Sequence, residues 1–184
     1  MSYKNGNMKI IELHENGLDI QFRIRENGVV ELADFSSQEV KKAAMEPKED
    51  IYYPAVEIHR SGTGSLNMHA YKNNINQSSV DFVYEKHELK EQDGGKELEI
   101  VMVSPEKLKA VYHMRLFDGV PAVQTWTEIT NEGSEDQGLT YVSSFIYQGI
   151  SRGGDKPYYK KQISMYRLTA GAVRHSGRNM MQRH

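Results

Sequence analysis

Residues 121–149 combine two alternating side-chain patterns with an acidic, glycine-containing break, and they include the only tryptophan of the chain. One face of the first half carries Val123, Thr125, Thr127, Ile129 and Asn131, and the other carries Gln124, Trp126, Glu128 and Thr130. A period of two is typical of a strand with one buried face. Residues 131–136 tolerate turn geometry, and alternation resumes at 139–146. The stretch therefore predicts a hairpin or a corner between two sheets, with Trp126 packed between sheets.

Similar alternation recurs along the preceding part of the chain, in short segments that are separated by turn-forming residues. The segments are 8–13, 18–24, 29–35, 55–59, 80–89, 98–103 and 108–117. Short strands at such even spacing predict an all-β fold, either an antiparallel sandwich or a barrel, with at most one or two short helices. No rhythm of alternating strands and long helices is visible, which argues against a nucleotide-binding parallel sheet.

Two segments do not follow the strand pattern. Residues 36–45 place Ser36 and Glu39 at capping-box spacing before good helix formers, so a short helix or an irregular excursion is expected there. Residues 51–76 contain Pro54, the turn 61–64 and a polar run, and they predict a long loop with one strand in it. Loops of this length are often functional, which makes this region the first candidate for a binding surface.

The length of 184 residues suits one domain, and we expect a β-sandwich at 1–166 followed by a basic tail at 167–184. From residue 156 onward there is no Asp or Glu, which predicts a poorly ordered terminus or, as an alternative, a polyanion-binding tail. A net charge of −2 gives no reason to expect nucleic acid or a membrane as partner. The absence of cysteine and of a signal-peptide pattern at the first residues leads us to expect a cytoplasmic protein.

No catalytic residue is assigned from the sequence. Hydrolysis of a glycosidic bond needs two convergent carboxylates, and no such pair stands out among the 25 acidic residues. Glu97 and Glu99 share one face of a strand and are expected on a solvated surface. Glu128 lies beside Trp126 and is expected to be a hydrogen-bonded structural residue.

No metal site and no cofactor are expected either. Among the seven histidines, His59 and His69 form the best candidate pair, but their spacing matches no compact metal motif. His87 and His113 fall inside strand patterns and are expected to be cross-strand neighbours or half-buried rings. The run 61–64 lacks the helix N-terminus and lysine of a phosphate loop, so we interpret it as a tight turn.

The long loop carries the residue types that bind sugars. Aromatic faces pack against sugar C–H groups, while amides and charged groups bind hydroxyls. The loop contributes Tyr52, Tyr53, His59, His69, Tyr71, Lys72, Asn73 and Asn74. Tyr53, His69, Lys72 and Asn73 are our candidate carbohydrate-binding residues.

Three segments, taken in their order along the chain, resemble the N-terminal β-sandwich domain of glycoside hydrolase family 36, the bacterial α-galactosidases. They are YPAVEIHRSGTGSLNMHAYKNN at 53–74, VDFVYEKHEL at 80–89, and ELEIVMVSPEKLKAVYHMRLFDGVPAVQTWTEITNEGSEDQGLTYVSSF at 97–145. The resemblance implies a supersandwich of galactose mutarotase-like shape. In such enzymes the sandwich precedes a (β/α)8 barrel that holds both catalytic aspartates. The likeness fades near Tyr166, which a truncated or frame-shifted reading frame would explain.

The resemblance implies a non-catalytic domain or truncated remnant of an enzyme that hydrolyses terminal α-galactosides. Its implied partners are a catalytic barrel domain, a galactoside ligand and a neighbouring subunit of a homo-oligomer. His69 and Lys72 best match the loop that, in the family, reaches the rim of a sugar pocket. A free-standing carbohydrate-binding protein is an alternative. A mutarotase-like epimerase is a weaker one, since it needs a histidine and a carboxylate facing one pocket and the sequence shows no such pair.

Overall fold

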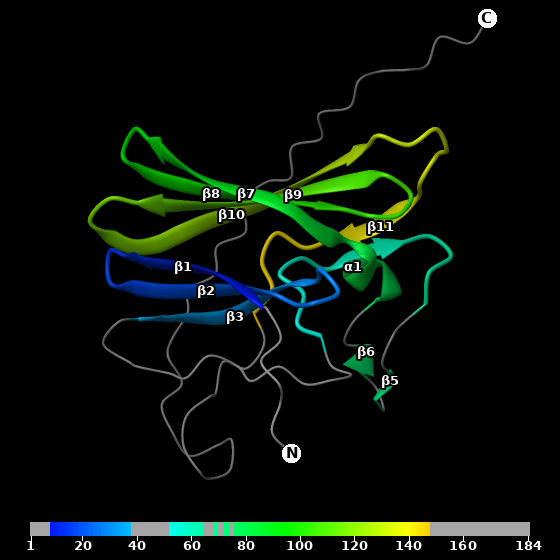
Figure 1. Cartoon of the computed structure of the whole chain (residues 1–184), viewed down its shortest axis with the longest axis horizontal. Coiled ribbons are helices and arrows are strands. Elements are labelled where there is room, and N and C mark those ends of the chain that lie inside the picture. Colours follow the sequence, from blue (N-terminus) through cyan, green and yellow to red (C-terminus); the bar gives the residue numbers. More distant parts are fainter. Residues whose placement is uncertain (1–7, 38–51, 65–67, 70–71, 74–75, 148–184) are drawn as a thin grey trace, which may run out of the picture.

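The computed structural model describes residues 8–37, 52–64, 68–69, 72–73 and 76–147. Its longer strands form two antiparallel sheets that pack face to face (Figure 1). The smaller sheet has the order β1-β2-β3 and consists of β1 (Lys9–Glu15), β2 (Leu18–Ile24) and β3 (Val30–Ser37). The larger sheet has the order β10-β9-β8-β7 and consists of β7 (Val83–Gln92), β8 (Gly95–Val103), β9 (Leu108–Phe117) and β10 (Val120–Asn131). The predicted all-β antiparallel sandwich is confirmed.

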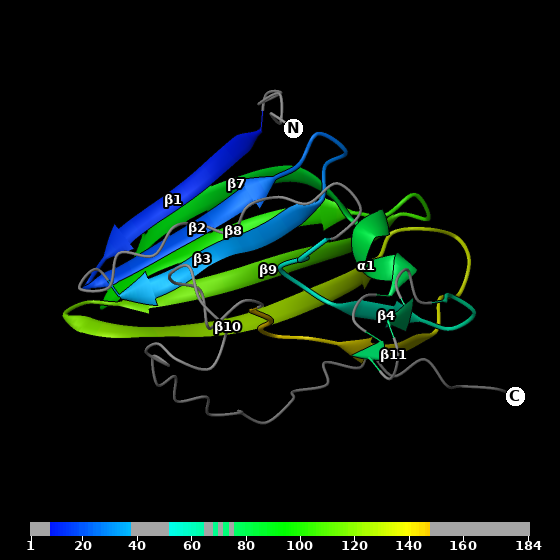
Figure 2. The same ribbon diagram turned by 90° about the horizontal axis from the view of Figure 1, so that it is seen from below.

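Short elements close one end of the sandwich. Strand β4 (Ile58–Arg60) pairs with β11 (Leu139–Val142), and β5 (Met68–His69) pairs with β6 (Lys72–Asn73). The chain therefore leaves β10 and pairs with β4 in a separate sheet, so the break at 131–136 is a corner between sheets and not a hairpin. Figure 2 shows β4, β11 and helix α1 (Gln77–Asp81) together beyond the ends of the long strands.

Helix α1 occupies the start of a segment that we predicted to be a strand. Asn76 is its N-cap, because the Asn76 side-chain oxygen accepts a hydrogen bond from the backbone N–H of Ser78. Ser79 then donates its hydroxyl to the carbonyl of Ile58 and joins the helix to β4. These local side-chain bonds outweigh the strand pattern predicted from residue 80 onward, and β7 begins only at Val83. Within the described ranges, no helix is long and apolar enough to span a membrane.

The core lies between the two sheets, where the inward faces of β1, β2 and β3 pack against those of β8 and β9. Phe22 of β2 and Tyr112 of β9 are both almost fully buried and meet edge to face, with ring centroids 5.8 Å apart. Burial raises the pKa of the Tyr112 phenol, so that this ring stays neutral. Strands β2 and β9 have the predicted bounds. Their inward residues alternate as predicted, while Arg23 and His113 on the outward faces are buried as well.

A buried ionic group lies on the other face of the smaller sheet. Arg23 on β2 pairs with Glu31 on β3, with an Nη2–Oε2 distance of 2.6 Å, and Arg25 reaches the second oxygen of Glu31 at 3.3 Å. Glu31 also accepts a hydrogen bond from the backbone N–H of Tyr53, which ties the following segment to β3. Glu31 has no exposed surface, so this ionic group is part of the interior.

Two sequence expectations fall largely outside the described residues. Ser36 and Ser37 end strand β3, while the rest of the candidate helix at 36–45 is not described. The basic tail at 167–184 is not described either. Both assignments stay predictions.

Replacing Glu31 with alanine removes the carboxylate that faces two guanidinium groups inside the protein. We expect the free energy of unfolding to fall by about 3 kcal/mol, because a buried ion pair that loses one member leaves a poorly compensated charge. Urea denaturation followed by circular dichroism measures the change. Glu12→Ala is the control, since Glu12 is exposed and contacts Gln21 and His14 at the surface of β1–β2. This variant should lose less than about 0.5 kcal/mol of stability. Equal losses of unfolding free energy in the Glu31 and Glu12 variants would contradict the assignment of Glu31 as a buried ion-pair partner of the two arginines.

Candidate functional site on the outer face of the larger sheet

The cross-strand register of the larger sheet brings a polar row to its outer face. Glu99 on β8 lies opposite His113 on β9, and His113 lies opposite Trp126 on β10. Side chains on neighbouring strands that are directly opposite lie within contact distance on the same face. Because Leu98, Ile100, Tyr112 and Met114 fill the core, this row is directed away from the smaller sheet.

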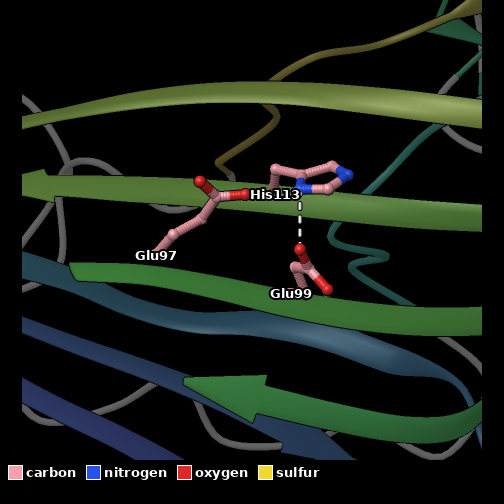
Figure 3. A group of neighbouring side chains, drawn as sticks. All are labelled: Glu97, Glu99 and His113. Carbon is pink, nitrogen blue, oxygen red and sulfur yellow. Dashed lines mark hydrogen bonds and ion pairs between the residues drawn. The ribbon is translucent and has the colours of Figure 1, made fainter. Parts of the chain in front are cut away.

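His113 is the centre of the row and is held by two carboxylates (Figure 3). Its Nδ1 lies 2.8 Å from an oxygen of Glu97 and 3.8 Å from an oxygen of Glu99. His113 is 7% exposed and Glu97 is 6% exposed, so their contact is a buried one. Glu97 accepts a further hydrogen bond from the side-chain amide of Gln92, at 2.6 Å.

Trp126 lies against one face of the His113 ring, and Glu128 lies near its Nε2 edge. The indole of Trp126 stacks on the imidazole, with centroids 4.5 Å apart and planes 5° from parallel. The Trp126 Nε1–H donates to Glu128 at 3.4 Å, and the same oxygen of Glu128 lies 3.7 Å from His113 Nε2. Among the described residues, this buried Nε2 has no hydrogen-bond partner.

Lys90 of the edge strand β7 completes the ionic surroundings. Its Nζ lies 2.5 Å from Glu99, and this hydrogen bond raises the pKa of the Lys90 ammonium group. Glu99 therefore has a cation on its solvent side and His113 on the other. The side chain of Glu99 is 22% exposed, so it is the most accessible of the three residues drawn in Figure 3.

The structure corrects two sequence expectations at this site. Glu97 is buried against His113, so the expected solvated face is wrong for this residue. Trp126 stacks on His113 at the outer face and does not pack between the sheets. Glu128 has the hydrogen-bonded neighbour that we predicted.

The geometry limits what these groups do chemically. Oxygens of Glu97 and Glu99 lie within 4.8 Å of each other, which is close to the spacing of about 5 Å between the carboxyl groups of retaining glycosidases. Nδ1 of His113 lies close to both carboxylates, however, and Glu97 is buried, so the pair does not flank an exposed cleft. An epimerase arrangement fails for a similar reason, because 3.7 Å between Nε2 and Glu128 leaves no room for a sugar ring.

The candidate carbohydrate-binding residues lie elsewhere. Strands β5 and β6 pair His69 with Lys72 and Met68 with Asn73 in backbone register, below α1 in Figure 1. Tyr53 is separate from this hairpin in the chain and donates its backbone N–H to Glu31. His59 is bonded to Glu57 at 2.8 Å and lies against Tyr141. A sugar-binding role for Tyr53, His69, Lys72 and Asn73 stays a prediction.

Comparison with known proteins gives matches to solved structures only. No protein-family model and no curated protein matches the chain. Two solved structures of the GH36 alpha-galactosidase AgaA from Geobacillus stearothermophilus, one of them a doubly substituted form in complex with raffinose, are similar to it. Each match has 13% identity and a TM-score of 0.48, and covers 71% of this chain and 23% of the enzyme chain. These enzymes are of the family that the sequence motifs resemble.

Replacing Glu97 with alanine removes the acceptor of the buried His113 Nδ1–H. We expect the free energy of unfolding to fall by about 1–3 kcal/mol, because a buried polar group without its partner is costly. Glu128→Ala is the matched control, since the Glu128 side chain is 64% exposed and its loss should cost about 0.5 kcal/mol or less. Urea denaturation measured by Trp126 emission reports both values. A Glu128→Ala variant that loses more stability than Glu97→Ala would contradict the assignment of Glu97 as the buried acceptor.

Proposed function

We propose that the chain is a non-catalytic β-sandwich domain of a larger glycoside hydrolase related to the α-galactosidases. In this proposal, residues 1–166 form the sandwich beside a separate catalytic barrel, and 167–184 form a basic tail. The order and spacing of the motifs at 53–74, 80–89 and 97–145 support the choice of family. The antiparallel sandwich is the architecture that this family resemblance implies.

The observation that carries the non-catalytic assignment is the position of His113 between Glu97 and Glu99. A glycosidase needs one carboxyl group that donates a proton and a second that attacks or activates water, with the substrate bond between them. Here Nδ1 of His113 lies 2.8 Å from Glu97 and 3.8 Å from Glu99, Gln92 bonds Glu97, and Lys90 bonds Glu99. Both carboxylates are thus committed to protein groups, which favours a structural or ion-binding role over bond cleavage.

The purified chain is expected to release no nitrophenol from nitrophenyl α-galactoside above the rate of a heated sample. The physical reason is that Glu97 and Glu99 do not border an open space in which a substrate could lie between a proton-donating and an attacking carboxyl group. An absorbance assay at 400 nm over several hours measures the rate, with an α-galactosidase as positive control. Activity that survives repeated purification and disappears in Glu99→Gln would overturn the non-catalytic assignment.

A second candidate function is that of a free-standing carbohydrate-binding protein. The observation that favours it is the backbone register of the β5–β6 hairpin, in which His69 lies opposite Lys72. An imidazole and an ammonium group at one hairpin offer hydrogen bonds to sugar hydroxyls. Asn73, which pairs with Met68 in the same hairpin, would add an amide.

Titration with galactose, melibiose and raffinose in a calorimeter tests this second function. Binding is expected to be at least about tenfold weaker in Lys72→Ala, since losing a hydrogen bond to a charged group costs about 1.5–3 kcal/mol. Lys86→Ala is the control, because Lys86 is an exposed lysine on β7. The absence of heat up to millimolar sugar would count against carbohydrate binding by the isolated chain, and it would leave the proposed domain assignment intact.

A further inference from the structure

We propose that Glu97, Glu99 and His113 form a binding site for a divalent transition cation such as Zn²⁺. One oxygen of each carboxylate and Nδ1 of His113 lie within 4.8 Å of one another. Two neighbouring strands supply all three ligands, so the positions of the ligands are fixed by the register of β8 and β9. This proposal is independent of the glycoside hydrolase assignment, since it rests only on these side chains.

The distances suit a small ion after slight side-chain adjustment. Zinc binds imidazole nitrogen and carboxylate oxygen at about 2.0–2.2 Å, which places the ligands of a tetrahedral ion roughly 3.4 Å apart. The observed separations from Nδ1, 2.8 Å to Glu97 and 3.8 Å to Glu99, lie on either side of that value. Rotation of the Glu99 side chain, which is the more exposed of the two, would bring its oxygen inward.

Nε2 of His113 is buried, has no hydrogen-bond partner among the described residues, and lies on the Glu128 side of the ring. A metal ion on Nδ1 takes the place of the proton there, so the neutral imidazole then carries its proton on Nε2. Glu128 is the acceptor nearest to that proton, with an oxygen 3.7 Å from Nε2. Metal-bound histidines commonly donate their second N–H to a carboxylate, which orients the ring. The exposed side chain of Glu128 would have to move closer than 3.7 Å to accept that proton.

The donor set indicates the kind of ion. One imidazole and two carboxylates, without a thiolate, suit Zn²⁺ and the neighbouring first-row ions better than copper(I). Three protein ligands leave a fourth position for water or another small ligand. Lys90 competes with the ion for Glu99, and its side chain is 37% exposed, so it is free to swing into solvent when the ion binds.

The experiment titrates the full chain, first treated with a chelator, with ZnCl₂ in a calorimeter and by fluorescence. Trp126 is the only tryptophan and stacks on His113, so its emission reports on this site. We expect a saturable change in emission at one equivalent of zinc, with the same midpoint as the heat. Affinity should fall at least tenfold in His113→Gln and in Glu99→Gln, and tenfold or more in Glu128→Gln.

The control variant is His14→Gln. His14 also lies between two carboxylates, 2.6 Å from Asp19 and 3.9 Å from Glu12, but it is on an exposed surface of β1. This variant should bind zinc as the unmodified chain does. Zinc binding without a change in Trp126 emission, or with equal affinity in Glu99→Gln, would place the ion elsewhere and overturn the proposal. Glu99→Gln keeps the test valid if His113→Gln does not fold, because Glu99 is partly exposed.

Discussion

The register of β8, β9 and β10 is the constraint on which both faces of the larger sheet depend. It directs Leu98, Tyr112 and Met114 into the core, and by the same alternation it directs Glu99, His113 and Trp126 outward. A slip of one residue would exchange the two faces and bury charge in the core. The hydrophobic core therefore fixes the geometry of the ionic row, although the two share no side chains.

Both sheets carry buried charge on the face turned away from the shared core. The smaller sheet buries Glu31 between two arginines, and the larger sheet buries Glu97 against His113. In each case the buried carboxylate has hydrogen-bond donors beside it, since leaving a buried charge without partners is costly. The difference lies in the partners: the arginines stay charged at any physiological pH, whereas an imidazole exchanges its proton or accepts a metal ion. Only the second group is thus suited to a ligand-dependent role.

The sequence predicted the sandwich well and the site poorly, for one physical reason. Alternation within a strand identifies which side chains share a face, and the bounds of β2 and β9 follow from it directly. It contains no information on which residue of the next strand lies opposite, and Glu97 is separated from His113 by a whole turn and most of a strand. The sequence-derived solvated face was therefore wrong for Glu97. Helix α1 was missed because its start depends on local bonds of Asn76 and Ser79, which a weak hydrophobic pattern does not reveal.

The pairing of β4 with β11 has a consequence for the growing chain. Val142 aligns with Ile58, and the backbone N–H of Ser143 donates to the carbonyl of Glu57, so segments more than 80 residues apart complete each other. During synthesis, β1, β2 and β3 are available to pair long before residues 139–143 leave the ribosome. The edge of β4 that later pairs with β11 has no partner strand while the four long strands are made. This end of the sandwich is thus complete only after β11, the last described strand, has been made and has paired with β4.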